Sequence, residues 1–259
     1  MLSNKVIVVI GGTSGIGLSA VKAFVKAGAK VIAVGRNEQK CEETQQILGE
    51  QGLAIAGDAT HEATAPNAIE KALNQFGSFD GLYHVAGGSG RKMGDGPLHE
   101  LSLQGWEATL QLNLTSIMLS NRAAVQQFLK QRTSGTILNM GSVLGFSPSP
   151  KYFTTHAYAA AKSAIIGFTK SIASYYAKDN IRVNMIAPAL VETPMAQRAA
   201  KDDDIMDFIK TKQPLDNGRI GMPTDTDGLA TYFMSDLSKF TTGQVVAIDG
   251  GWSLSEGQY

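Results

Sequence analysis

Cysteine is almost absent from this chain of 259 residues, in which Cys41 is the only one. No disulfide can therefore form within the chain, and we expect a protein of a reducing compartment, with cytoplasmic localisation. An excess of charge is also absent, because 23 Lys and Arg residues balance 23 Asp and Glu residues. This balance gives no basic surface for nucleic acid and no polybasic patch for a membrane, so neither partner is expected.

Long apolar runs are missing as well. The apolar run from Val6 to Ile10 is far shorter than the roughly 20 residues of a membrane-spanning helix. It lacks a basic leader and a cleavage-type end, so we expect no signal peptide. His61, His84 and His99 show no metal-ligand spacing with Cys41 or with carboxylates, which argues against a metal site. No G-x-S-x-G turn is present, which argues against a hydrolase.

The chain does contain short β-branched runs that alternate with longer segments of helical periodicity. Ile16, Ala20, Ala23 and Ala27 recur at helical spacing and form a stripe that can cover a sheet. Continuous apolar strands separated by helices are typical of parallel strands buried on both faces. We therefore predict an α/β fold with a doubly wound sheet of about seven parallel strands and helices on both faces. The expected strands are residues 5–10, 30–34, 53–57, 81–86, 135–140, 181–187 and 243–248.

Two stretches without periodicity interrupt this pattern, at residues 87–97 and 189–218. Both follow expected strands, and ligands of such sheets bind beyond the carboxyl ends of the strands. We expect the two stretches to form the walls of a pocket, with about residues 189–218 as a lid over the substrate. No repeat or linker marks a boundary, so one domain is predicted over residues 1–259.

A glycine-rich turn, GGTSGIG, follows the first expected strand. Gly11 permits a tight turn, Gly15 lets the backbone approach a phosphate, and Gly17 lets the next helix pack on the strand. The N-terminus of that helix would present N–H groups to a pyrophosphate. The spacing is G-x-x-x-G-x-G instead of the commoner G-x-G-x-x-G, but its place between a strand and an amphipathic helix indicates dinucleotide binding.

The end of the second expected strand should meet the adenosine ribose of such a dinucleotide. A carboxylate there would accept a hydrogen bond from the 2′-hydroxyl group, whereas an arginine would pair with a 2′-phosphate. The chain has Gly35 followed by Arg36. We therefore expect NADP(H) to be favoured over NAD(H), the alternative being an Arg36 that stacks on adenine or stays in solvent.

Tyr158 and Lys162 lie four residues apart in YAAAK, so they share one face of the helix expected there. A tyrosine of pKa about 10 must shift by about 3 units, or about 4 kcal/mol, to exchange a proton near pH 7. One positive charge about 4–5 Å away in a partly buried site supplies roughly 3–4 kcal/mol. The pair can therefore act as a proton donor and acceptor, although this spacing alone is also typical of a tyrosine beside a solvated lysine.

These motifs occur in one order along the chain, and the order carries more information than any motif alone. GGTSGIG is followed by Asp58, Ala86-Gly87, Asn113, Ser142, YAAAK and APALVETP at residues 187–194. In this order the sequence resembles the short-chain dehydrogenase/reductase family, in its form of about 250 residues. The resemblance implies a Rossmann-type fold, a homodimer or homotetramer, and interconversion of a carbonyl and a secondary alcohol by hydride transfer.

The resemblance also implies roles for individual residues. Tyr158 would be the general acid for carbonyl reduction and the general base for alcohol oxidation, and Lys162 would bind the nicotinamide ribose and lower the tyrosine pKa. Ser142 would bind the substrate oxygen, and Asn113 would hold a water that connects Lys162 with solvent. The expected cofactor-binding residues are Gly11, Thr13, Ser14, Gly15, Ile16, Gly17, Arg36, Asp58, Ala59, Ala86, Gly87, Tyr158, Lys162, Pro188, Val191 and Thr193.

The sequence departs from the family pattern at Ile10 and Ala189, where we expect both changes to be tolerated, and in two further places. His84-Val85 stands where the family usually has an asparagine before Ala86, which we expect to weaken polar bracing of the strand but not the chemistry. The interval between Ser142 and Tyr158 carries an extra segment, FSPSPKYFTTHA, beside the expected pocket.

The expected function is therefore that of an NADP(H)-dependent carbonyl reductase or alcohol dehydrogenase acting on a small molecule. A 3-oxoacyl-[acyl-carrier-protein] reductase is the alternative, ranked second because no cluster of Arg or Lys follows the YAAAK helix to meet an acidic carrier. A catalytically silent dinucleotide-binding sensor is a third reading.

Overall fold

A computed structural model describes residues 1–257 of the chain, and within them seven parallel strands form one sheet. The strand order is β3-β2-β1-β4-β5-β6-β7. The strands are β1 (Val6–Ile10), β2 (Lys30–Gly35), β3 (Gly52–Ala56), β4 (Gly81–His84), β5 (Gly135–Met140), β6 (Ile181–Pro188) and β7 (Val245–Ile248). The predicted doubly wound α/β sheet of seven parallel strands is confirmed.

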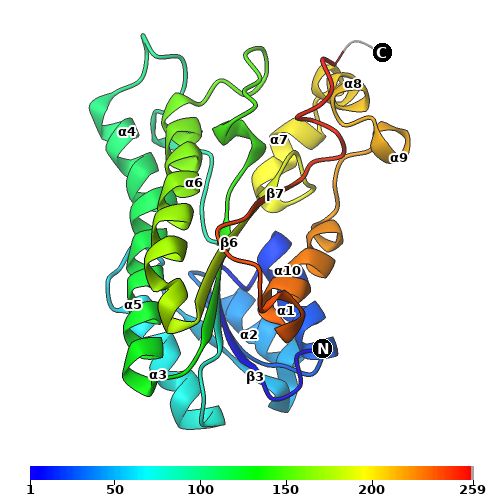
Figure 1. The fold of residues 1–259 in the computed structure, drawn as a ribbon. Coiled ribbons are helices and arrows are strands. Elements are labelled where there is room, and N and C mark those ends of the chain that lie inside the picture. The colour runs from blue at the N-terminus through cyan, green and yellow to red at the C-terminus, as the bar shows by residue number, and fades with distance from the viewer. Residues whose placement is uncertain (258–259) are drawn as a thin grey trace.

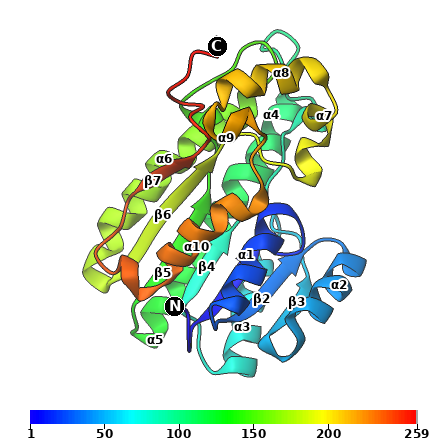
Figure 2. The ribbon, with the colours of Figure 1, turned by 90° about the vertical axis from the view of Figure 1, so that its right-hand side faces the viewer.

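Helices cover both faces of this sheet (Figures 1 and 2). The helices are α1 (Gly15–Lys26), α2 (Glu38–Leu48), α3 (Thr64–Phe76), α4 (Leu103–Leu110), α5 (Ser116–Gln131), α6 (His156–Tyr176), α7 (Gln197–Ala200), α8 (Asp203–Lys212), α9 (Leu215–Gly218) and α10 (Asp227–Met234). Figure 1 shows α3 to α6 on one face and α1, α2 and α10 on the other. No helix of the described residues is long and apolar enough to cross a membrane.

Helix α1 covers the sheet with a broader face than the predicted stripe. Ala20 lies in the core, and Ile16 and Ala27 pack against the same core cluster. Val21 and Phe24, outside the stripe, are also fully buried. These larger side chains remove more apolar area from water than the alanines do.

The order of the strands creates a crevice at the carboxyl ends of the central strands β1 and β4. The chain winds outward from β1 to β3 and then returns past β1 to form β4, so β1 pairs with both β2 and β4. At the carboxyl end of β1, Ile10 pairs with Val34 on one side and with His84 on the other. This is the switch point at which ligands of open α/β sheets bind.

Strand β4 ends two residues earlier than predicted, at His84. The backbone N–H groups of Val85 and Ala86 both donate to the carbonyl oxygen of Ile10, at 2.8 and 2.9 Å. Because one carbonyl accepts both groups, the chain leaves the regular ladder there. It passes so close to Gly11 (φ +88°) that a Cβ atom on this glycine would lie 2.6 Å from the nitrogen of Ala86.

His84 provides polar bracing of β4 in place of the usual asparagine. Its Nδ1 lies 2.7 Å from Oγ of Ser120, and its Nε2 lies 3.4 Å from Oγ of Ser116. Both serines belong to α5, so the bracing joins the strand to the helix. The imidazole is fully buried, and this burial, together with the nearby charge of Lys162, lowers the pKa of His84 to about 3.

Replacing His84 with asparagine should therefore change how stability depends on pH. Since the folded pKa lies below the unfolded value of about 6.5, acid protonates the unfolded chain first. As pH falls from about 6.5 toward 3, the protein loses stability, and His84 accounts for about 2 kcal/mol of this loss at pH 5. H84N should lack this contribution. Urea unfolding at pH 7 and pH 5 measures the difference.

The matched control is H99N, the same substitution at an exposed histidine. If the difference in unfolding free energy between H84N and the unaltered protein were the same at pH 7 and pH 5, His84 would not be a buried neutral imidazole.

Candidate active site

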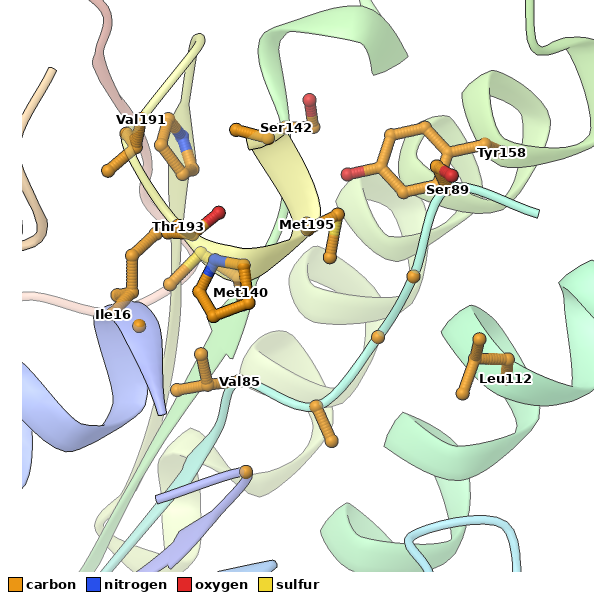
Figure 3. A pocket seen from close by; sticks show the side chains of 18 of the residues that line it. Ile16, Val85, Ser89, Leu112, Met140, Ser142, Tyr158, Val191, Thr193 and Met195 are labelled. Carbon is orange, nitrogen blue, oxygen red and sulfur yellow. The ribbon is translucent and has the colours of Figure 1, made fainter. Parts of the chain in front are cut away.

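A cavity of about 700 Å³ opens at the carboxyl ends of the central strands (Figure 3). Its walls come from the turn between β1 and α1, the ends of β2, β4, β5 and β6, and the N-terminal part of α6. Of the residues expected at the site, all but two line this cavity. The exceptions are Gly17 and Asn113.

Gly17 acts through packing and does not face the cavity. A Cβ atom at this position would lie 2.0 Å from the carbonyl oxygen of Gly11, so only glycine lets α1 approach the end of β1. Ser14, at the N-cap of α1, makes no side-chain capping bond, and the first turn holds no acidic residue. The first N–H groups of α1 therefore remain available beside the cavity, which fits the pyrophosphate of a dinucleotide.

Arg36 and Asp58 lie at the end of the cavity formed by β2 and β3. Nη1 of Arg36 is 3.9 Å from Oδ2 of Asp58, and the arginine side chain is 67% exposed. Burial alone would raise the pKa of Asp58, but hydrogen bonds from the N–H and hydroxyl groups of Thr60 and the charge of Arg36 hold it below its usual value. The loosely paired guanidinium group can turn toward a phosphate in this corner.

Tyr158 and Ser142 point into the cavity from opposite walls (Figure 3). Burial raises the pKa of Tyr158 to about 12, although its hydrogen bond with Ser142 acts in the opposite direction. Oγ of Ser142 also accepts a bond of 3.2 Å from the N–H group of Leu144, which holds the serine at the start of a short helical turn. A protonated phenol and a hydroxyl group therefore face one point in the cavity.

Lys162 lies one turn further along α6, with its side chain almost completely buried. Its Nζ donates to the carbonyl oxygen of Met140 at 2.9 Å and lies 5.5 Å from the ring centre of Tyr158. Burial lowers the pKa of Lys162 to about 7. In the free pocket burial dominates and raises the pKa of Tyr158, so the effect of Lys162 on the phenol stays a prediction.

Asn113 lies behind the cavity, in a π-helical turn (Gln111–Thr115) between α4 and α5. Its Nδ2 donates to the carbonyl oxygens of Gly88 and Thr109, both at 2.9 Å, and its Oδ1 accepts from the N–H group of Gly88 at 3.0 Å. A Cβ atom on Gly87 would lie 2.8 Å from this Oδ1 and 3.6 Å from Nζ of Lys162. The amide thus fixes the loop that separates it from the lysine.

Asp95 is a functional residue that the sequence pattern does not reveal. Its carboxylate is buried and accepts the N–H groups of Ala157 at 3.0 Å and Tyr158 at 2.9 Å. It therefore caps the N-terminus of α6 at the tyrosine itself, where a negative charge is favourable. The one signal in the sequence was that Asp95 lies within residues 87–97, the stretch expected to form a wall of the pocket.

Comparisons with known proteins agree with this geometry. The profile of a family described as enoyl-(acyl carrier protein) reductase matches residues 11–253. The chain is 34% identical over 257 residues to 2-(S)-hydroxypropyl-CoM dehydrogenase 3 of Xanthobacter autotrophicus, covering 96% of this chain and 97% of that protein. It is 31% identical over 256 residues to 2-dehydro-3-deoxy-D-gluconate 5-dehydrogenase of Dickeya dadantii, covering 97% and 96%.

A solved structure of 3-ketoacyl-(acyl-carrier-protein) reductase from Brucella melitensis, complexed with NADH, superposes with a TM-score of 0.85 at 28% identity. The match covers 98% of this chain and 100% of that one. The chain belongs to the short-chain dehydrogenase/reductase family.

As a short-chain dehydrogenase/reductase, the protein is an oxidoreductase that acts on CH–OH groups and uses a nicotinamide dinucleotide. Membership of a family of enzymes sets aside the reading as a silent sensor. In such enzymes the cofactor carries the hydride chemistry, and the protein supplies binding and orientation.

Asp95 provides a test of how this dehydrogenase holds its tyrosine. D95A should lower the free energy of unfolding by about 2 kcal/mol, because two buried N–H groups lose a charged acceptor. It should also lower kcat tenfold or more while the KM for the cofactor stays unchanged, and D95N should restore part of both losses because its amide oxygen can accept one bond.

Asp80 is the matched control, since it accepts the N–H group of Val6 at 2.8 Å just before the amino end of β4, outside the cavity. D80A should lower the free energy of unfolding by about 1–2 kcal/mol and leave kcat unchanged. A kcat for D95A equal to that of D80A would show that Asp95 does not position the tyrosine.

Proposed function

We propose that this short-chain dehydrogenase/reductase interconverts a small-molecule carbonyl and a secondary alcohol with NADP(H), and that Tyr158 is its general acid and base. The observation that supports the proposal most strongly is the convergence of the Tyr158 phenol, the Ser142 hydroxyl and the Lys162 amine beside the glycine-rich turn. The bound cofactor supplies or accepts the hydride.

The protein groups would divide the remaining work among them. Ser142 would donate a hydrogen bond to the substrate oxygen and stabilise its developing charge, while Tyr158 gives that oxygen a proton during reduction. Lys162, with a pKa of about 7, can replace this proton near neutral pH. We propose that a water held by Asn113 links the lysine with solvent, and that oxidation follows the same path in reverse.

Cofactor binding is proposed for the residues named from the sequence. The N–H groups after Ser14 would hold the pyrophosphate, Asp58 and Ala59 would meet the adenine, and Val191 and Thr193 would hold the nicotinamide carboxamide. The position of Arg36 at the cavity supports a preference for NADP(H), because its guanidinium group can bind a 2′-phosphate.

The segment 189–218 is proposed as the substrate lid of a single cofactor-binding domain. Figure 2 shows α7, α8 and α9 close together beyond the end of β6. Val191, Thr193 and Ala199 of this segment line the cavity. Helices of this segment that stand over the pocket would exclude water during hydride transfer.

We also propose cytoplasmic localisation and a homodimer or homotetramer that packs through α5 and α6. Leu129 on α5 and Tyr175 on α6 are exposed apolar side chains, which supports an interface on these helices.

A 3-oxoacyl-[acyl-carrier-protein] reductase remains the second candidate. It is supported by the named activity of the Brucella melitensis relative. The candidates are distinguished by comparing free ketones with an acetoacetyl thioester bound to acyl carrier protein. Only a carrier-protein reductase should prefer the protein-bound thioester.

Tyr158 is tested by substitution with phenylalanine. Y158F should lower turnover of NADPH with carbonyl substrates to below a few per cent, because the ring remains but no proton donor does. NADPH binding, followed by fluorescence titration, should stay nearly unchanged. The control is Y175F on the exposed side of α6, which should keep full activity, and Y158F activity near that level would remove Tyr158 from its proposed role.

Arg36 is tested by R36D, which should weaken NADPH binding tenfold or more and shift the preference toward NADH, because a carboxylate repels the 2′-phosphate. The ratio of kcat/KM for the two cofactors is the measurement. K40D changes the charge of an exposed residue in the first turns of α2 that does not line the cavity, and it should leave the ratio unchanged. An R36D ratio equal to that of K40D would mean that another group binds the phosphate.

A further inference from the structure

Three basic residues line the cavity and have no part in the proposed proton transfer or cofactor binding. Arg91 and Lys92 come from a short helical turn (Arg91–Met93) in the loop after β4, and Arg198 comes from α7. The two arginines converge on one acceptor. Nη2 of Arg91 donates to the carbonyl oxygen of Tyr152 at 3.1 Å, and Nη2 of Arg198 donates to the same oxygen at 3.2 Å.

The protein balances the positive charges of these arginines only in part, through the carboxylate of Asp95 near Arg91. Within residues 1–257, no ion pair includes Arg91 or Arg198. The carboxylate that acts on Arg91, that of Asp95, already accepts two N–H groups at the start of α6. Burial and the neighbouring charge of Arg198 lower the pKa of Arg91, which is the effect of two like charges held close together.

Two guanidinium groups with a single neutral acceptor leave most of their N–H donors free. Arginine presents five donors in a rigid fork that matches the oxygens of a carboxylate, sulfonate or phosphate. An anion between Arg91 and Arg198 would relieve the repulsion and fill these donors, whereas a neutral group would do neither.

The position of the arginines relates them to the substrate. The carbonyl of Tyr152 belongs to the extra segment between Ser142 and Tyr158, and the neighbouring Phe153 lines the cavity together with Trp252. The rings of Phe153 and Trp252 pack edge to face at 5.6 Å. The cavity therefore joins reacting hydroxyl groups, an apolar wall and a pair of cations.

We propose that Arg91 and Arg198 bind an oxyanion group of the substrate, so that this enzyme acts on carbonyl compounds or alcohols with a terminal carboxylate, sulfonate or phosphate. The proposal rests on the carbonyl–alcohol function proposed above. It makes the two arginines substrate-specificity residues, contributed by the loop after β4 and by the lid.

Matched substrate pairs test the proposal, because each pair differs mainly in the anion. The pairs are 4-oxopentanoate with its methyl ester, 3-oxobutane-1-sulfonate with butanone, and dihydroxyacetone phosphate with dihydroxyacetone. NADPH oxidation should give a kcat/KM at least tenfold higher for the anion in at least one pair. A neutral partner that is as good or better in every pair would overturn the proposal.

Substitutions then assign the preference to the arginines. R91M and R198M should each raise the KM for the anion about tenfold and leave the neutral partner and the KM for NADPH within twofold, and the double variant should lose the preference. K71M, which removes an exposed charge on α3 that does not line the cavity, is the control and should change none of these values. If a substitution lowered kcat/KM equally for both compounds of a pair, or raised the KM for NADPH, the assignment would be overturned.

Binding separates this proposal from the proposed function. Isothermal titration calorimetry of the NADP⁺-saturated protein should show tighter binding of the anion than of the neutral partner, and the double variant should bind both equally. If no compound is turned over but this preference is present, the carbonyl–alcohol function fails and the anion site stands. If no pair shows the preference in either assay, the anion site is wrong.

Discussion

The bond between the buried amine of Lys162 and the carbonyl oxygen of Met140 fixes the position of the active-site helix. It joins α6 to the last residue of β5, and Ser142 follows two residues after that strand end. Tyr158 lies one helical turn before the lysine, so the same anchor directs its phenol toward the serine. A single contact thus brings together groups from a strand end and a helix that are distant in sequence.

Burial gives these groups their protonation states. Tyr158, with a pKa raised to about 12, keeps its proton, while Lys162, with a pKa lowered to about 7, can gain or lose one near neutral pH. This arrangement suits a site that must donate a proton and then recover it. Asp95 and Asn113 hold the loop after β4 against α6 and the π-helical turn, and that loop also carries Arg91 into the cavity.

The sequence predicts the features that depend on local patterns. β-Branched runs predicted the seven strands, and the resemblance to the family implied that Ser142 acts together with Tyr158. The sequence pattern did not predict the early end of β4. That end depends on a contact between distant segments, in which two backbone N–H groups donate to the carbonyl of Ile10. Asp95 is 62 residues from Ala157, and Arg91 and Arg198 meet through Tyr152, so no periodicity could reveal either arrangement. The same limit explains His84, whose serine partners lie on α5.

The protonation state of Lys162 is the most direct test of this account. In protein prepared with lysine labelled by ¹³C at Cε, an NMR titration follows each amine, and the K162M variant assigns the resonance of Lys162. The account predicts a resonance that titrates with a pKa of about 7 in the free protein, well below the ordinary lysine value of about 10.4. A Lys162 resonance that titrates at the ordinary lysine value would contradict it.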